Sequence, residues 1–180
     1  MPDNSPTSSV LAHGVDRVAA EYHMFLAIDP DHYDGDVADI TNGLVGASAD
    51  GVFVTTGVQM GPVSCEVSVR AEAPPDPTPE EMREWDEIVD VSFTSATGNL
   101  VVDAVDSETP VLPNLCGRGP GTYRVRVHAR GRDSHAKDIL DLGIEDVPEH
   151  YRLITWPSPV SPDTVHQTRD QFGQELRALS

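Results

Sequence analysis

The sequence predicts an all-β protein, an antiparallel β-sandwich of about eight strands with a short C-terminal helix. Apolar and polar residues alternate with a period of two in several segments, which is the pattern of a strand with one buried face. The chain has 14 glycines and 15 prolines among its 180 residues. Many short strands joined by Gly/Pro turns are typical of sandwiches and barrels.

Three regions are expected along the chain. Residues 1–18 open on a polar stretch rich in proline and serine, and we expect a flexible N-terminal segment there. Residues 19–160 carry the alternating pattern and should form the β-sandwich domain. Residues 161–180 should form a helical tail, because their apolar residues recur at helical spacing after Ser161-Pro162.

The clearest strand covers residues 123–130, directly after a Pro-Gly turn. Its buried face is expected to carry the apolar side chains of Tyr123, Val125, Val127 and Ala129. The opposite face, expected to contact solvent, carries a row of cations that we call the Arg row: Arg124, Arg126, His128 and Arg130. Such a row is suited to binding carboxylates or phosphates, but cross-strand carboxylates such as Asp86 and Asp90 would instead neutralise it.

The other strands are expected at residues 22–28, 43–47, 51–56, 63–70, 85–93, 100–105 and 149–156, with a further strand or turn at 139–144. Asp50-Gly51 between apolar runs indicates a hairpin. Four prolines between residues 73 and 79 interrupt the sheet. Thr78-Pro79 followed by acids is typical of a helix start.

The charge is strongly negative, with 30 acidic residues against 12 basic ones and a formal net charge of −18 at pH 7. This balance argues against direct contact with nucleic acid, because phosphate binding depends on positive surface. It favours a basic protein partner, although a salt-adapted proteome would show the same excess.

Acidic residues concentrate in two stretches. The first, at 29–39, contains no lysine or arginine, and the second follows the proline-rich segment. We expect partner-binding residues in both: Asp29, Asp31, Asp34, Asp36, Glu80, Glu81 and Glu84. Solvated loops without a partner would have the same composition. The first stretch fails as an EF-hand, because placing Gly35 at the sixth position puts Pro30 first.

No pattern in the sequence marks catalytic residues, a metal site or a cofactor. There is no G-x-S-x-G elbow, and Cys65 and Cys116 do not form a C-x-x-C motif, so we expect both as small buried groups. His128, Asp133 and His135 match no standard zinc spacing. The chain also shows no signal peptide, and its apolar run at 24–28 is too short to span a bilayer, so we expect a cytoplasmic protein without a membrane partner.

Three short motifs carry a resemblance to a known family. They are Tyr22-His23-Met24-Phe25, Ala47-Ser48-Ala49-Asp50-Gly51 and Gly119-Pro120-Gly121-Thr122-Tyr123. In this order the chain resembles, over residues 20–130, the small competence-associated inhibitors of the DNA-entry nuclease. It departs from them in the proline-rich segment at 73–79 and in its end after Arg132. The resemblance implies a compact β-sandwich that binds protein and performs no chemistry.

These observations favour a non-enzymatic acidic module that binds a basic protein, as an inhibitor or immunity-type protein of a nuclease would. The alternative is a β-sandwich that binds a small molecule or carbohydrate on the Arg row, with Trp85 or Trp156 as a stacking wall. An enzyme would need a pocket where acids and histidines converge, which a sequence does not display.

Overall fold

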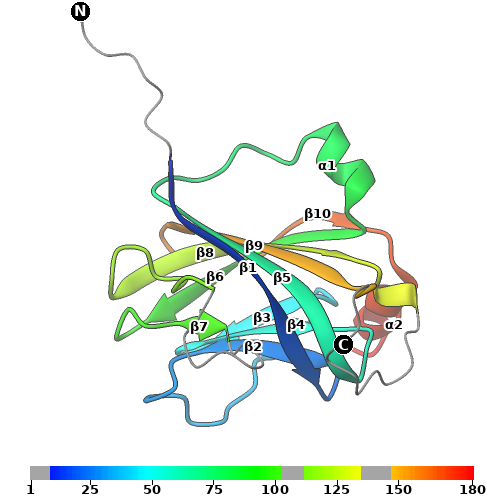
Figure 1. The fold of residues 1–180 in the computed structure, drawn as a ribbon, viewed down its shortest axis with the longest axis horizontal. Coiled ribbons are helices and arrows are strands. Elements are labelled where there is room, and N and C mark those ends of the chain that lie inside the picture. The colour runs from blue at the N-terminus through cyan, green and yellow to red at the C-terminus, as the bar shows by residue number, and fades with distance from the viewer. Residues whose placement is uncertain (1–8, 103–111, 135–146) are drawn as a thin grey trace, which may run out of the picture.

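The structure is a computed structural model that describes residues 9–102, 112–134 and 147–180. Strands dominate it, and two short α-helices and one 3-10 helix complete the described elements (Figure 1). The strands are β1 Val10–Glu21, β2 Met24–Ile28, β3 Val45–Ser48, β4 Gly51–Thr55, β5 Met60–Arg70, β6 Glu87–Ser95, β7 Val101–Val102, β8 Gly121–Arg130, β9 His150–Pro157 and β10 Thr164–Thr168. The helices are α1 Pro79–Glu84, η1 Arg132–Ser134 and α2 Gln171–Ala178.

All ten strands belong to one hydrogen-bonded sheet, in the order β10-β6-β8-β9-β5-β1-β2-β4-β3 with β7 paired to β2. A mostly β fold with a C-terminal helix is as predicted, but the sheet is mixed, because β5 and β9 run parallel. The prediction of purely antiparallel pairing came from hairpin signals, which report only on strands that are neighbours in sequence. The pairing of β5 with β9 joins residues 86 positions apart, from Ser64 with His150 to Val69 with Thr155.

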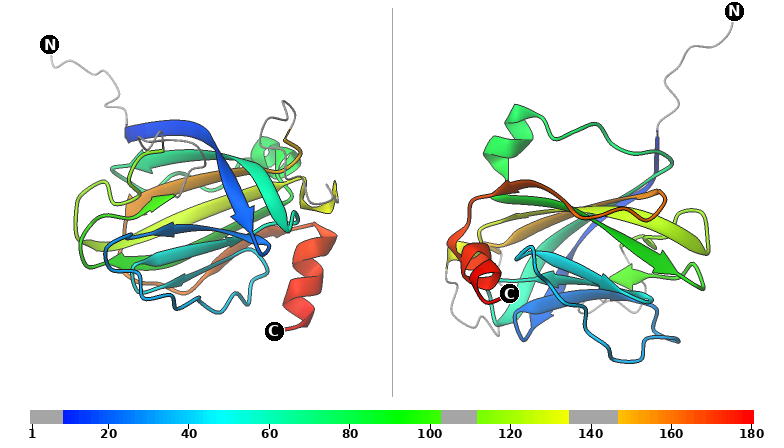
Figure 2. Two further views of the ribbon diagram at one scale, coloured as in Figure 1. Left: turned by 60° about the horizontal axis from the view of Figure 1, so that its bottom comes forward. Right: turned by 180° about the vertical axis from the view of Figure 1, so that it is seen from behind.

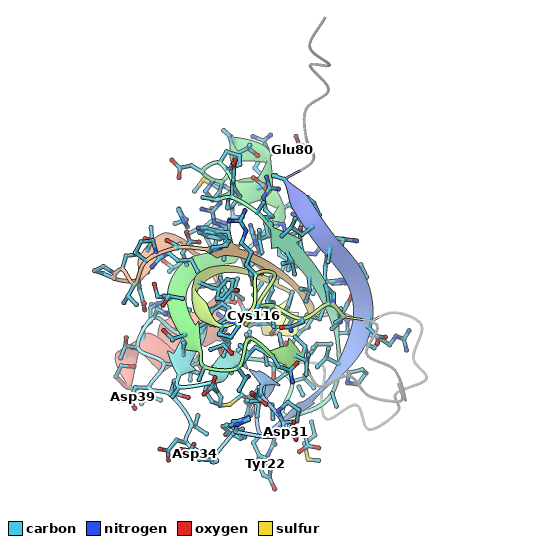
Figure 3. All side chains as sticks on the ribbon, turned by 90° about the vertical axis from the view of Figure 1, so that its left-hand side faces the viewer. Tyr22, Asp31, Asp34, Asp39, Glu80 and Cys116 are labelled. Atoms are coloured by element: carbon cyan, nitrogen blue, oxygen red, sulfur yellow. The ribbon has the colours of Figure 1, made fainter. Side chains whose placement is uncertain are left out.

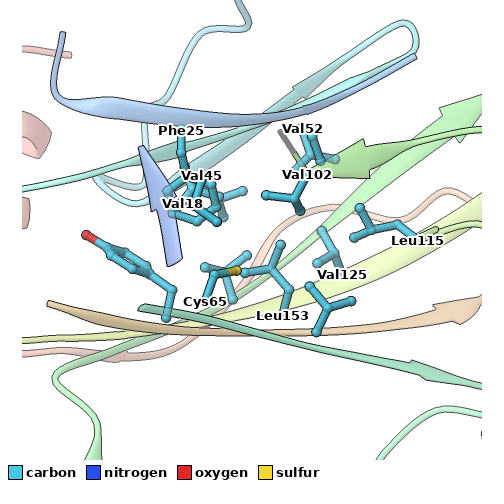
Figure 4. Packing of buried hydrophobic residues seen from close by; sticks show 14 of the residues in the cluster. Val18, Phe25, Val45, Val52, Cys65, Val102, Leu115, Val125 and Leu153 are labelled. Carbon is cyan, nitrogen blue, oxygen red and sulfur yellow. The ribbon is translucent and has the colours of Figure 1, made fainter. Parts of the chain in front are cut away.

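The sheet curls so that its two halves lie in layers over a common core (Figure 2). Strands β2, β3 and β4 form one layer, and β6, β8 and β9 lie opposite them. Val18, Phe25 and Val52 meet Val125 and Leu153 between the layers (Figure 4). The apolar side chains of β8 are buried there as predicted, and both cysteines are buried free thiols, also as predicted.

The flexible segment expected up to residue 18 is wrong from Val10 onward. β1 starts there and pairs with β5 in a register that runs to Glu21 opposite Met60. The pattern hid this strand, because Leu11 and Val15 are apolar but point to solvent. Residues 1–8 lie outside the described part of the chain, as does the strand or turn expected at 139–144.

The C-terminal region contains a strand as well as the predicted helix. β10 pairs with β6 and forms one edge of the sheet, and α2 begins only at Gln171 with Asp170 as its N-cap. α1 starts where Thr78-Pro79 predicted, with the Thr78 and Glu81 side chains closing a capping box. Neither α-helix in the described ranges is long and apolar enough to cross a membrane.

Candidate interaction surfaces

The Asp loop, residues 29–39, is held at its start by Asp29. This carboxylate is only 1% exposed. It accepts hydrogen bonds from the Thr97 hydroxyl and, at 3.0 Å, from the backbone N–H of Asp31, and it pairs with His32 Nδ1 at 3.2 Å. The Thr97 hydroxyl lowers the pKa of Asp29. Asp29 therefore fixes the loop from inside and is not placed to contact a partner.

Asp31, Asp34 and Asp36 lie on the exposed part of the same loop. The Asp34 carboxylate accepts a hydrogen bond of 3.1 Å from the backbone of Asp36, which stabilises the turn between them. Within the described ranges none of the three carboxylates pairs with a cation. Their negative potential is therefore directed into solvent.

The acids of α1 lie at the opposite end of the molecule from the Asp loop (Figure 3). Glu80 is exposed, but Glu81 is used by the capping box, its Oε2 accepting from the Thr78 backbone at 2.9 Å. Glu84 pairs with Arg130 at 3.0 Å. The seven predicted partner-binding residues are thus divided between two distant surfaces, and of the four that form no ion pair with the described residues, three (Asp31, Asp34 and Asp36) lie on the Asp loop and one (Glu80) on α1.

The Arg row shares one face of β8 as predicted, but the prediction that this face contacts solvent is wrong. Arg124 and Arg126 are each 5% exposed and His128 is 0% exposed. The segment leading into β10 covers Arg124, whose Nη1 donates to Ser161 and Pro162 carbonyls at 2.9 and 3.0 Å. Arg126 donates to both carboxylate oxygens of Asp90, at 2.8 and 3.1 Å, across the pair of strands.

The proline-rich segment and α1 fold over the remainder of the row. Arg126 Nη1 donates to the Pro75 carbonyl at 2.7 Å, and the Trp85 ring packs on His128 with centroids 5.4 Å apart. Guanidinium groups of Arg130 and Arg152 each lie 5.0 Å from the Trp85 ring centroid. Burial lowers the pKa of His128 to about 4, which keeps it neutral at physiological pH. An incoming anion would have to displace contacts that the row already makes.

A group of buried charges that the sequence analysis missed attaches α2 to the sheet. We call it the buried ion cluster: Glu87, Arg132 and Asp170, which are buried, and Arg177, whose side chain is 25% exposed. Arg132 is 1% exposed and donates to Asp170 through Nε at 2.6 Å and Nη2 at 2.8 Å. Its Nη1 donates to the Gly43 carbonyl and the Thr55 hydroxyl at 2.9 and 2.8 Å. The cluster joins η1, β4, β6 and α2.

Within the buried ion cluster, Glu87 is the carboxylate that lies on the sheet, at the start of β6. It accepts from Arg177 Nη1 at 2.9 Å and from the backbone N–H groups of Arg169 and Asp170 at 3.0 and 3.2 Å. Burial, followed by the nearby charge of Asp170, raises the pKa of Glu87 to about 7. No periodic pattern predicts this cluster, because its members are distant in sequence and meet only in the folded chain.

The described residues contain no group of three or more His, Cys, Asp or Glu side chains arranged to hold a metal ion. His128 is buried beneath Trp85, and Asp133 accepts from the Gln171 and Phe172 backbone N–H groups, both at 2.9 Å, at the start of α2. His135, the third residue of the His128, Asp133 and His135 set compared with zinc spacings, lies outside the described ranges.

Solved structures with the same fold include ComJ from Bacillus subtilis, an inhibitor of the DNA degrading activity of NucA. The two share a TM-score of 0.50 and 11% sequence identity over 80% of this chain and 95% of ComJ. Crocagin biosynthetic gene J gives a TM-score of 0.48 and 18% identity over 82% of this chain and 98% of that one. No protein-family model and no curated protein matches the sequence. The likeness to ComJ confirms, at the level of the fold, the resemblance that the three short motifs predicted.

Proposed function

We propose that this protein is a cytoplasmic, non-enzymatic inhibitor of a NucA-like DNA-degrading nuclease, which it binds through the Asp loop. The observation that carries the proposal is the exposure of Asp31, Asp34 and Asp36 without a compensating cation in the described ranges. The fold shared with ComJ and the formal net charge of −18 support it.

The physical basis is competition for the nuclease's DNA-binding cleft. A surface that binds DNA presents cations to phosphate groups. Carboxylates on a fixed loop offer those cations an alternative anionic partner, and a strongly negative protein is also drawn toward a basic one over long range. Because such attraction is screened within about 8 Å at physiological ionic strength, inhibition should weaken as salt is raised.

The first prediction is that the purified protein slows DNA degradation by NucA in a concentration-dependent manner at low salt. Digestion of a linear duplex is followed by gel electrophoresis, with ComJ as the positive control. A protein at tenfold molar excess over NucA that leaves digestion unchanged while ComJ blocks it would contradict the proposed function.

The second prediction assigns the effect to the Asp loop. Changing Asp31, Asp34 and Asp36 together to Asn should reduce the association rate with NucA by about tenfold or more at low salt, because steering depends on these charges. The matched control neutralises Glu72, Asp76 and Glu80, which are exposed between the end of β5 and the first turn of α1. It changes the net charge equally at the other end of the molecule. Equal losses in both variants would show that total charge, and not the loop, controls binding.

A further inference from the structure

The start of the Asp loop is fastened to two connections of the sheet. The backbone N–H of Asp29 donates at 3.2 Å to the carbonyl of Asp50, which lies in the turn between β3 and β4. The Asp50 carboxylate in turn accepts a 2.9 Å hydrogen bond from the backbone N–H of Ala96, in the connection between β6 and β7. The next residue, Thr97, donates its hydroxyl to the Asp29 carboxylate. These bonds join the Asp loop to both connections.

The Asp29 carboxylate has three polar partners, and Thr97 is the one that lies outside the Asp loop. The other two are the backbone N–H of Asp31 at 3.0 Å and His32 Nδ1 at 3.2 Å. The Asp29 carbonyl also accepts from the backbone N–H groups of His32 and Tyr33, at 3.2 and 2.9 Å. Residues 29–33 are thus wound around Asp29, and the Thr97 hydroxyl joins this turn to the sheet.

Loss of the Thr97 hydroxyl would leave the Asp29 carboxylate short of a donor. Asp29 is 1% exposed, and a buried charge that lacks a hydrogen bond is costly. The chain would relieve this cost by turning the carboxylate toward water, and Asp31 would move with it because the two are hydrogen-bonded. Further along the loop, the bond from the Ser48 hydroxyl to the Asp36 carbonyl is long, at 3.4 Å, and constrains the loop weakly. The position of Asp31 therefore depends on Thr97 through Asp29.

We propose that Thr97 is a positioning residue for the nuclease interface, because its bond to Asp29 holds the Asp loop in the conformation that binds. This rests on the function proposed above and adds to that interface a residue that carries no charge and lies outside the loop. A loop that is already ordered loses less conformational freedom when it binds, so its affinity is higher. The charges steer the approach of the partner, whereas the fixed position of the loop slows its dissociation.

Thr97→Val separates position from charge, because it removes the hydroxyl and leaves every carboxylate in the chain. The Kd for NucA should rise about tenfold, mainly through faster dissociation, while the association rate stays within about twofold. The backbone amides of Asp31, His32 and Tyr33 should exchange with solvent about tenfold faster, since their acceptor is no longer held. Thr97→Ser retains the hydroxyl, so it should stay within about threefold of the unchanged protein in both measurements.

Thr155→Val is the matched control for the loss of a threonine hydroxyl. Thr155 lies on β9, and its buried hydroxyl donates to the Leu115 carbonyl at 2.9 Å, a bond that involves no residue of the Asp loop. This variant should leave both rate constants for NucA within about twofold. Surface plasmon resonance on immobilised NucA measures the rates, and nuclear magnetic resonance follows the amide exchange.

Three results would overturn the positioning role of Thr97 while leaving the proposed function intact. The first is a Thr97→Val protein that binds NucA as tightly as the unchanged one. The second is equal weakening by Thr97→Ser, because the effect would then not depend on the hydroxyl. The third is equal weakening by Thr155→Val, which would assign the loss to general destabilisation. An unchanged protein that does not bind NucA would overturn both the role and the proposed function.

Discussion

Replacing Arg132 with methionine is expected to lower the free energy of unfolding by about 3–5 kcal/mol, the usual cost of removing one partner from a buried ionic group. Arg132 donates two hydrogen bonds to Asp170 and lies 3.9 Å from the Glu87 carboxylate. Methionine fills a similar length with apolar atoms but supplies no donor. Asp170 would lose its main cation, and Glu87 would retain only Arg177, which lies at 2.9 Å.

Urea unfolding followed by tryptophan fluorescence measures this loss, and Arg130→Met is the matched control. Arg130 pairs with Glu84 at 3.0 Å, but both side chains are more than one-third exposed, so its loss should cost about 1 kcal/mol or less. Because α2 is attached through the buried ion cluster, Arg132→Met should also increase amide hydrogen exchange in residues 171–178. Equal destabilisation by the two substitutions would show that the cluster does not hold the fold together.

Local patterns were sufficient to predict most strands, because side-chain alternation is a property of consecutive residues. β8 and the hairpin of β3 and β4 are of this kind, and so is the start of α1 at Thr78. β1 was missed because exposed apolar residues mask its alternation, and β10 because it is a short edge strand with mixed polarity. The pairing of β5 with β9 depends on contacts that no local pattern reports.

The sequence shows the residue types at the candidate site but not the environment of each side chain. The sequence shows that Asp29 and Asp31 are both acidic, but only the structure shows that one is buried against Thr97 and the other exposed. The Arg row likewise lies on one face of β8, yet the cover that buries it comes from segments about 35–50 residues away. Alternation assigns a side chain to a face; it does not say what covers that face.

Stability should change little between pH 5 and pH 7.5 in the unchanged protein, because two buried groups act in opposite directions. The pKa of Glu87 is raised from 4.5 to about 7. The protonated Glu87 carboxyl therefore stabilises the folded protein fully below pH 4.5, and this stabilisation is lost as the pH rises through about 7. The pKa of His128 is lowered from 6.5 to about 4, so folding becomes more favourable as pH rises from 4 to 6.5. Each effect is on the order of 2 kcal/mol over this range.

Two further groups with shifted pKa values reinforce the opposing pair. Burial raises the pKa of Glu149, which adds to the effect of Glu87, and burial lowers that of His150, which adds to the effect of His128. Asp29, Glu66 and Glu81 have lowered pKa values and therefore act below this pH range. Among the described residues, these four buried or half-buried groups consequently set the balance between pH 5 and pH 7.5.

Single substitutions should separate the two contributions. Glu87→Gln retains an acceptor for the backbone of Arg169 and Asp170 but does not titrate, so this variant should be about 2 kcal/mol more stable at pH 7.5 than at pH 5. His128→Phe retains a ring against Trp85 and should be about 2 kcal/mol less stable at pH 7.5 than at pH 5. Urea midpoints at the two pH values measure both slopes. Slopes of the same sign in the two variants would contradict the assignment, because burial raises the pKa of the Glu87 carboxyl and lowers that of the His128 imidazole, and the two shifts change stability with pH in opposite directions.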